Sequence, residues 1–328
     1  MLMSLDIDCY ENSYHPNHVN CFHIPVAAAC GYYDFNNYFY YLFYHCLSEN
    51  WPNEELGFFD KVLFILNTLG LTIKTYHTDN PDEFISLIKS TIDKHSMVIL
   101  PAVYIYLFYF PQYRNNATTH FLMVSGYDPK RSAIQIRDTI QDFVITPGLY
   151  KIQMHESLLK EIWINSNNFF KERNPRNYNM FYSIEKTGES KVSSYIDVTK
   201  DFLSSYNPEN SKLANIVEQF PKLAEDIKKN ELSSMLYLKR ELCHTTAVLF
   251  DCFSYMFNIN NRALVNELHT FKGQYINFRE RIVTKMHAEA LRNRKSFSIQ
   301  ERENIKNEIL LKDRRLFSLI QDILRVQL

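Results

Sequence analysis

Residues 20–30 read NCFHIPVAAAC, a stretch that places one thiol at the start of an apolar segment with helical character. Pro25 is tolerated only in the first turn of a helix, so we expect this helix to begin within a few residues of Cys21. A cysteine at a helix N-terminus faces unsatisfied backbone N–H groups and the positive end of the helix dipole, and both favour the reactive thiolate. Cys21 is therefore the candidate nucleophile.

A candidate base lies in residues 118–128, which read TTHFLMVSGYD. His120 opens an apolar run of strand length that ends at a turn, and a second strand, residues 133–137, leads directly to Asp138. A hairpin brings the first residue of one strand close to the last residue of its partner. We therefore expect Asp138 to orient the imidazole of His120 and to fix its tautomer. Asp128 is the alternative carboxylate, but it lies in an Asp-Pro turn, where Asp is favoured for turn formation.

A cysteine at a helix start, a His-Phe strand about a hundred residues later and an Asp after the next strand together resemble the papain-like cysteine peptidases, specifically the C39-peptidase-like branch. Within that branch the chain is similar to the N-terminal domain of butirosin biosynthesis protein H and to the papain-like amide-forming enzyme of closthioamide assembly. The resemblance covers roughly residues 9–185, and Cys21, His120 and Asp138 occupy the positions of the catalytic residues. It implies an α+β catalytic domain with a papain-like fold.

The oxyanion hole departs from the papain pattern. Papain-like peptidases usually carry a Gln six residues before the Cys, and His15 stands at that position here. We expect the oxyanion to be met by the backbone N–H of Cys21 and by a side chain of the preceding loop. The candidates for that side chain, in decreasing order of preference, are Asn17, His15 and Asn20.

Composition sets the broad class of the protein. A chain of 328 residues with 46% hydrophobic and 15% aromatic residues is large enough for two folded domains. The net charge of −1 gives no general attraction to nucleic acid or to an anionic membrane. Acidic residues near the N-terminus do not fit a secretory signal, and no apolar run reaches transmembrane length. We therefore expect a cytoplasmic protein that binds neither nucleic acid nor membrane.

The six cysteines show no CxxC spacing, so neither a disulfide framework nor a metal site is expected. We interpret four of them as buried packing residues: Cys30, Cys46, Cys243 and Cys252. No cofactor is expected apart from a substrate carried on the phosphopantetheine arm of a partner protein, which the resemblance implies.

Apolar periodicity and turn residues predict the elements of the first domain. Helices are expected over 58–70, 80–94 and 154–160, the second with Asn80 as N-cap, and an aromatic helix over 34–46. Strands are expected over 71–76, 97–103, 104–110, 143–150, 162–164 and 181–185, with a loop over 165–180.

Residues 186–190 are the expected domain boundary, which gives a catalytic domain of residues 1–188 and an α-helical bundle of residues 189–328. Five amphipathic segments predict this bundle: 194–206, 211–229, 232–257, 261–290 and 298–327. Ser298 and Glu301 form a capping-box pattern at the start of the last segment. The helical domain is also compatible with dimerisation of the protein.

The resemblance implies an acyltransferase or amide synthase of specialised metabolism. Such an enzyme takes an acyl group from a carrier-protein thioester onto Cys21 and passes it to an amine. A cysteine peptidase that cleaves a leader or small peptide is the alternative, with water in place of the amine. A binding module that has lost its catalytic residues is the third hypothesis, and the presence of Cys21, His120 and Asp138 argues against it.

Overall fold

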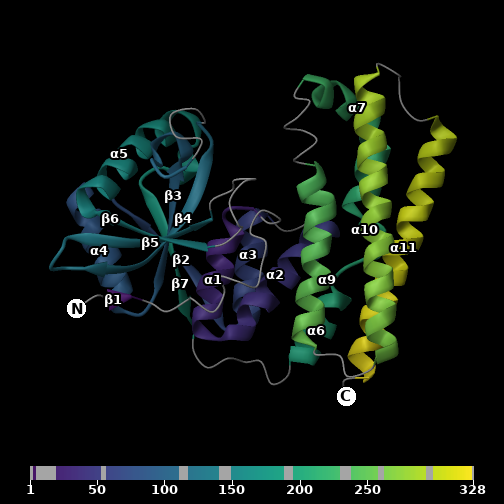
Figure 1. Cartoon of the computed structure of the whole chain (residues 1–328), viewed down its shortest axis with the longest axis horizontal. Helices are drawn as coiled ribbons and strands as arrows, with labels where there is room; N and C mark the ends of the chain where they lie inside the picture. Colours follow the sequence, from purple (N-terminus) through teal and green to yellow (C-terminus); the bar gives the residue numbers. More distant parts are fainter. Residues whose placement is uncertain are drawn as a thin grey trace. The chain divides into compact units, whose positions relative to one another are not determined.

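The computed structural model describes residues 3–4, 20–52, 57–110, 117–139, 149–187, 195–229, 238–257, 262–292 and 298–326. Packing divides the chain into two compact units (Figure 1). The first comprises Met1–Tyr38 and Leu69–Ser190, and the second comprises Phe39–Thr68 and Lys191–Leu328. The combination of an antiparallel sheet with helices confirms the expected α+β class.

The described residues of the first unit form a seven-stranded sheet in which every pair of neighbouring strands is antiparallel. The strand order is β2-β7-β3-β4-β5-β6, and β1 pairs with β4. The strands are β1 (Met3–Ser4), β2 (Leu71–His77), β3 (Met97–Val103), β4 (Thr119–Asp128), β5 (Ala133–Thr139), β6 (Leu149–His155) and β7 (Met180–Lys186). The two hairpin strands expected around His120 and Asp138 are therefore present as β4 and β5.

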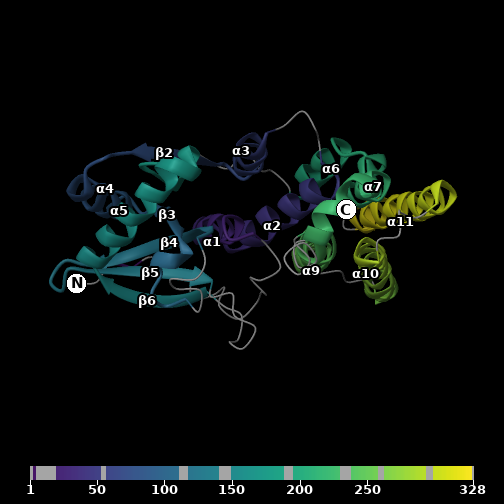
Figure 2. The same ribbon diagram turned by 90° about the horizontal axis from the view of Figure 1, so that it is seen from above.

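Helices cover both faces of this sheet: α1 (His23–Tyr33) on one, and α4 (Pro81–Asp93) and α5 (Glu156–Arg173) on the other (Figures 1 and 2). Ring contacts assign the faces because successive strand residues point to opposite sides. Phe22, at the start of α1, contacts Phe121 and Tyr182, with ring centroids 4.9 and 6.0 Å apart. Phe181 contacts Phe84 of α4 on the other face, at 5.9 Å.

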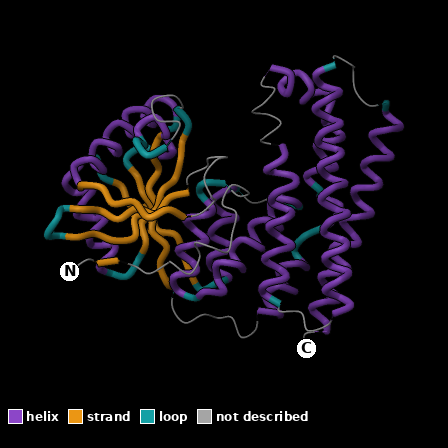
Figure 3. Tube along the Cα trace, viewed as in Figure 1, coloured by secondary structure: helices purple, strands orange, loops and turns teal. Residues whose placement is uncertain are grey.

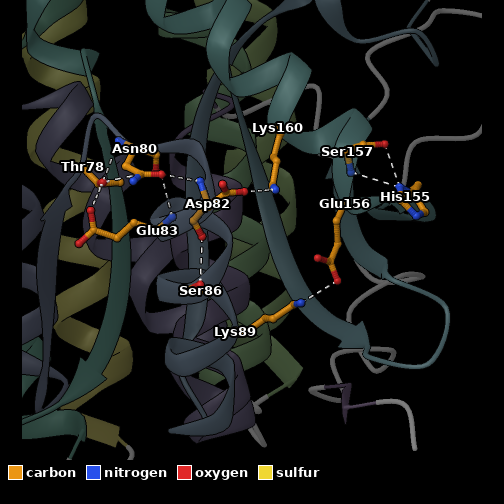
Figure 4. A network of polar contacts seen from close by, with 10 residues as sticks. All are labelled: Thr78, Asn80, Asp82, Glu83, Ser86, Lys89, His155, Glu156, Ser157 and Lys160. Carbon is orange, nitrogen blue, oxygen red and sulfur yellow. Dashed lines mark hydrogen bonds and ion pairs between the residues drawn. The ribbon is translucent and has the colours of Figure 1, made fainter.

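Polar contacts fix α4 and α5 against each other (Figure 4). Asn80 caps α4 as expected, since its side-chain oxygen accepts hydrogen bonds from the N–H groups of Asp82 and Glu83. Ion pairs join the two helices, one between Lys160 and Asp82 and one between Lys89 and Glu156. The helical layer on this face is thus anchored at several points along its length.

Helix α5 corrects the sequence prediction for residues 154–180. A short helix, a strand over 162–164 and a long loop were expected, but a single helix runs from Glu156 to Arg173. Its buried residues recur at helical spacing and pack toward the sheet: Leu159, Ile162, Trp163, Ser166, Asn167 and Phe170.

The strand predicted over 104–110 is also wrong. A 3-10 helix, η3 (Tyr104–Tyr106), follows β3 directly, and turns continue to Phe110. Of the strand predicted over 143–150, residues 143–148 lie outside the described residues, and β6 begins at Leu149.

In the second unit the described residues form helices and no strand (Figure 3). The α-helices that contribute to it are α2 (Phe35–Asn50, from residue 39), α3 (Phe58–Thr68), α6 (Tyr195–Ser204), α7 (Lys212–Lys229), α9 (Thr245–Met256), α10 (Arg262–Leu291) and α11 (Ile299–Val326). Shorter helical turns are η5 (Pro208–Asn210) and the π-helical η6 (Arg240–His244). The capping box expected before α11 is confirmed: Ser298 N–H donates to Glu301 Oε2 at 3.0 Å, and Glu301 N–H donates to Ser298 Oγ at 3.2 Å.

Residues 39–68 pack with the C-terminal helices, whereas the sequence-based division at residue 188 places them in the first domain. Tyr44 and Thr199 share a buried hydrogen bond of 3.0 Å, and Trp51 Nε1–H donates to Asp313 Oδ2 at 3.1 Å. These buried contacts make the aromatic helix α2 part of the helical core from residue 39 onward. In the part of the chain that the structure describes, no helix is both long and apolar enough to cross a membrane.

Candidate active site

His120 and Asp138 meet inside the first unit. His120 Nε2 and Asp138 Oδ1 are 2.6 Å apart, and both side chains have no exposed surface. His120 is the second residue of β4, opposite Ala102 of β3, and Asp138 is near the end of β5. A hydrogen bond from Nε2–H to this carboxylate leaves Nδ1 as the nitrogen available for proton transfer.

Aromatic residues from the segment after β3 enclose this pair. The rings of Tyr104 and His120 stack with centroids 4.4 Å apart, and Phe110 meets the imidazole edge to face at 5.1 Å. Tyr109 donates its hydroxyl hydrogen to Asp138 Oδ2 at 2.7 Å, so both oxygens of the carboxylate accept a hydrogen bond. The imidazole is therefore held by ring packing as well as by its hydrogen bond to Asp138.

Cys21 lies beside this histidine. It is half-buried in a turn, two residues before α1 begins at His23. The thiol lies near enough to His120 to hydrogen-bond with the imidazole and raise its pKa. His120 Nδ1 is buried, and it is the nitrogen that can serve the thiol because Nε2 is engaged by Asp138. The structure thus brings Cys21, His120 and Asp138 together.

Opposing effects set the pKa of His120. Burial lowers the pKa of the imidazole, because the charged form loses its hydration. The charge of Asp138 and its hydrogen bond, together with the hydrogen bond and charge of Cys21, raise the pKa more strongly, to about 10. The site therefore favours an imidazolium at neutral pH, the partner that a cysteine thiolate requires.

Asp128 is at the opposite end of β4 from His120. Its Oδ1 accepts a hydrogen bond of 3.0 Å from the N–H of Lys130, and its Oδ2 lies 3.9 Å from Arg131 Nε. Asp128 therefore closes the hairpin turn, and Asp138 is the carboxylate that contacts the imidazole.

Of the oxyanion candidates, His15 and Asn17 lie outside the described residues. Asn20 lies beside the thiol, and its Oδ1 accepts hydrogen bonds from Cys21 Sγ at 3.5 Å and from Phe22 N–H at 3.1 Å. Among the described residues, no group accepts a hydrogen bond from the N–H of Cys21.

The other described cysteines are buried. Burial raises the pKa of Cys30 well above its ordinary value and that of Cys243 to about 11. Such thiols are poor nucleophiles, which agrees with their interpretation as packing residues. Among the described residues, no group of three or more His, Cys, Asp and Glu side chains could hold a metal ion.

Sequence reasoning missed Tyr104, Tyr109 and Phe110 as neighbours of the histidine. The available signal was the density of aromatic residues over 104–110. Interpreted as a strand, that segment would have sent alternate rings to opposite faces. The 3-10 turn instead brings three of them to His120 and Asp138.

Comparison with curated proteins found no match. Comparison with protein families found a match over residues 21–139, just over a third of the chain. The matched segment begins at Cys21 and ends one residue after Asp138, so it contains all three residues of the site. The expected resemblance to butirosin biosynthesis protein H is therefore confirmed over residues 21–139, which match the family described as butirosin biosynthesis protein H, N-terminal.

Proposed function

We propose that this protein is a cysteine-dependent acyltransferase with a papain-like catalytic domain, which forms amide bonds through an acyl-Cys21 intermediate. The observation that carries the proposal is the buried 2.6 Å contact between His120 Nε2 and Asp138 Oδ1. It leaves the other imidazole nitrogen for a half-buried thiol at a helix start. Nucleophile, base and orienting carboxylate are the parts that covalent acyl transfer needs.

The steps follow from these parts. His120 Nδ1 holds the proton that Cys21 has given up, and the thiolate attacks the carbonyl carbon of an acyl thioester. The negative charge on the carbonyl oxygen is met by the N–H of Cys21 and by a donor of the preceding loop, with Asn17, His15 and Asn20 as candidates. The carbonyl re-forms as the departing thiolate takes the proton from His120, which leaves the acyl group on Cys21.

The second half of the reaction repeats this chemistry with an amine. His120 takes a proton as the amine attacks the acyl-cysteine, and the thiolate of Cys21 leaves. The products are the amide and the thiolate of Cys21 beside the imidazolium of His120, which is the state from which the reaction began. Asp138 stabilises the imidazolium in both halves, and the rings of Tyr104 and Phe110 limit the access of water to it.

The family match supports a biosynthetic role, since the family is named for a protein of butirosin biosynthesis, an antibiotic pathway. An acyl group presented on the phosphopantetheine arm of a carrier protein is the donor we propose. Carrier proteins are usually acidic, and the mildly basic sequence after residue 200 suits such a partner.

Intact-protein mass spectrometry tests the proposal. The full chain is mixed with an acyl thioester of pantetheine, with Cys21→Ala as the control variant. We expect an acyl adduct that maps to Cys21, is absent from Cys21→Ala, and disappears as an amide forms when an amine is added. The absence of any adduct, together with Cys21-dependent cleavage of a peptide library, would instead assign the protein as a peptidase.

A further inference from the structure

A groove of about 400 Å³ lies in the first unit beside the segment that encloses His120. Its volume falls within the range of about 300–1,000 Å³ that is usual for small-ligand sites. One wall is formed by Ile105, Tyr106 and Phe108, of which Phe108 is 45% exposed. An exposed ring of this size beside a hollow is available for contact with a ligand.

The other wall is one stripe of α5. It consists of Leu158, Glu161, Ile162 and Asn165, which are spaced three and four residues apart and so share one side of the helix. Leu158 and Ile162 are its apolar residues, and Glu161 and Asn165 are its polar residues. An apolar groove with a few polar groups is the usual composition of a small-molecule site.

The α5 wall is held by contacts that do not involve the groove. Trp163 stacks on Phe84 with centroids 4.5 Å apart, and the Ser166 hydroxyl accepts a hydrogen bond of 3.1 Å from the N–H of Val103. Lys160 is engaged by Asp82 of α4 (Figure 4). The wall is thus preformed, which reduces the entropy lost when a ligand binds.

The negative charge in the groove indicates the charge of the ligand that would bind there. Glu161 is the single charged residue among those that line it, and its side chain is exposed. Among the described residues, no cation lies within ion-pair distance of this carboxylate. A ligand with an apolar body and an ammonium group would satisfy both the apolar surfaces and Glu161, and the rings of Tyr106 and Phe108 add an affinity for cations. We propose that this groove binds a small apolar primary amine.

Occupation of the groove is coupled to His120 through a single short segment. Ile105, Tyr106 and Phe108 line the groove, while Tyr104 and Phe110, which flank them in sequence, pack on the imidazole. The imidazole also lies on the α5 side of the sheet, because Phe121, the next residue, points to the α1 side. A ligand that fixes Phe108 therefore restricts the rings that hold His120.

Binding is tested without turnover, on the full chain carrying Cys21→Ala. Hexylamine is titrated by calorimetry and by NMR of isotope-labelled histidine, with hexanol as the uncharged probe. We expect hexylamine to bind more tightly than hexanol and to shift the His120 signals. Glu161→Gln should weaken hexylamine binding by about tenfold and leave hexanol binding unchanged. Phe108→Ala should weaken both.

Glu172→Gln is the matched control, since Glu172 is an exposed carboxylate on the same helix but does not line the groove. Equal binding of hexylamine and hexanol, or equal effects of Glu161→Gln and Glu172→Gln, would overturn the proposal. So would hexylamine binding that survives Phe108→Ala unchanged.

The bound amine could serve as the acceptor of the acyl group or as an effector of the enzyme. Turnover of an acyl thioester in the presence of hexylamine distinguishes these two roles. If the bound amine is the acceptor, hexylamine is consumed as amide and Glu161→Gln raises its KM with little change in kcat. If it is an effector, hexylamine changes the rate of Cys21 acylation and is not consumed. This last arm rests on the proposed function. Hexylamine binding without any acylation of Cys21 would refute the proposed acyltransferase function, but it would still support the groove as an amine-binding site.

Discussion

A histidine with no exposed surface keeps a positive charge only when its neighbours compensate for the lost hydration. His120 is such a residue, and the carboxylate of Asp138 2.6 Å away is its compensation. The hydroxyl of Tyr109 holds that carboxylate in turn. The protonation state of His120 is therefore the most direct measure of whether these contacts are formed.

We expect His120 to remain an imidazolium at pH 8, because its pKa is raised from 6.5 to about 10. A folded-state pKa above the unfolded value means that the resulting stability is fully present below about pH 6.5 and is lost as pH rises toward 10. The ¹⁵N shifts of the labelled imidazole, followed from pH 6 to 11, measure this directly. Asp138→Asn should lower the pKa. A wild-type titration centred near pH 6.5 would show that Asp138 and Cys21 do not raise the pKa of His120.

Substitution of the two candidate carboxylates should separate their roles. Asp138→Asn removes the charge that stabilises the imidazolium and should reduce acyl transfer by on the order of 10³–10⁴-fold. Asp128→Asn keeps a side-chain oxygen for the Lys130 N–H and should change the rate by about twofold or less. Single-turnover acylation of Cys21 is the measurement, and circular dichroism checks that both variants fold. Equal losses of rate would remove Asp138 from the role proposed for it.

Whether a contact of the site can be predicted from the sequence depends on whether a local sequence pattern encodes it. The proximity of Cys21, His120 and Asp138 could be predicted because a helix start and a hairpin are local patterns. Tyr109 could not, because its contact with Asp138 depends on a 3-10 turn after β3 that an aromatic run does not encode. Aromatic residues of this kind fit a strand and a cleft wall equally well.

At the scale of single elements, α5 shows why short windows mislead. Ile162-Trp163-Ile164 has the composition of a strand, and the Asn-rich residues after it have the composition of a loop. Over the full 18 residues, however, the buried positions follow a helical period. Ser166 and Asn167 belong to the buried face because they hydrogen-bond backbone groups of residues 103 and 179. Those partners are distant in sequence, so the local pattern could not reveal them.

The N-cap of α4 was predicted from local sequence, and its contribution can be measured. Asn80→Ala leaves the N–H groups of Asp82 and Glu83 without their acceptor and should lower the free energy of unfolding by about 1 kcal/mol. Asn80→Asp keeps an acceptor and adds a negative charge at the helix N-terminus, so it should cost little or nothing. Urea denaturation compares the two variants. An equal decrease in the free energy of unfolding for both variants would mean that the hydrogen bonds accepted by the Asn80 side chain do not stabilise α4.

At the scale of the whole molecule, the chain order and the packing order differ. Residues 39–68 lie between two segments of the first unit in sequence but pack with the helices after residue 191. The tyrosines of α2 could be recognised as buried, yet the sequence does not say against which partner. The rings of Tyr44 and Phe202 pack at a tilt with centroids 4.3 Å apart, and Trp51 meets Phe317 edge to face at 5.0 Å. Such long-range ring contacts leave no local signature.

A fragment of residues 1–190 should therefore not behave as an independent domain. It retains Tyr41, Tyr44 and Trp51, each fully buried in the whole chain, but lacks the helices that cover them. We expect the fragment to bind a hydrophobic dye and to aggregate, because a contiguous apolar surface of this kind is not stable in water. Co-expression with residues 191–328 should restore solubility.

The two tryptophans, Trp51 and Trp163, make this expectation specific. In a fragment carrying Trp163→Phe, the emission of Trp51 should shift to longer wavelength relative to the same substitution in the full chain, because its indole loses Asp313 and Phe317. In the fragment carrying Trp51→Phe, Trp163 keeps its stacking on Phe84 within the first unit and should emit as in the full chain. A soluble, monomeric fragment in which neither emission shifts would show that residues 39–68 do not need the C-terminal helices.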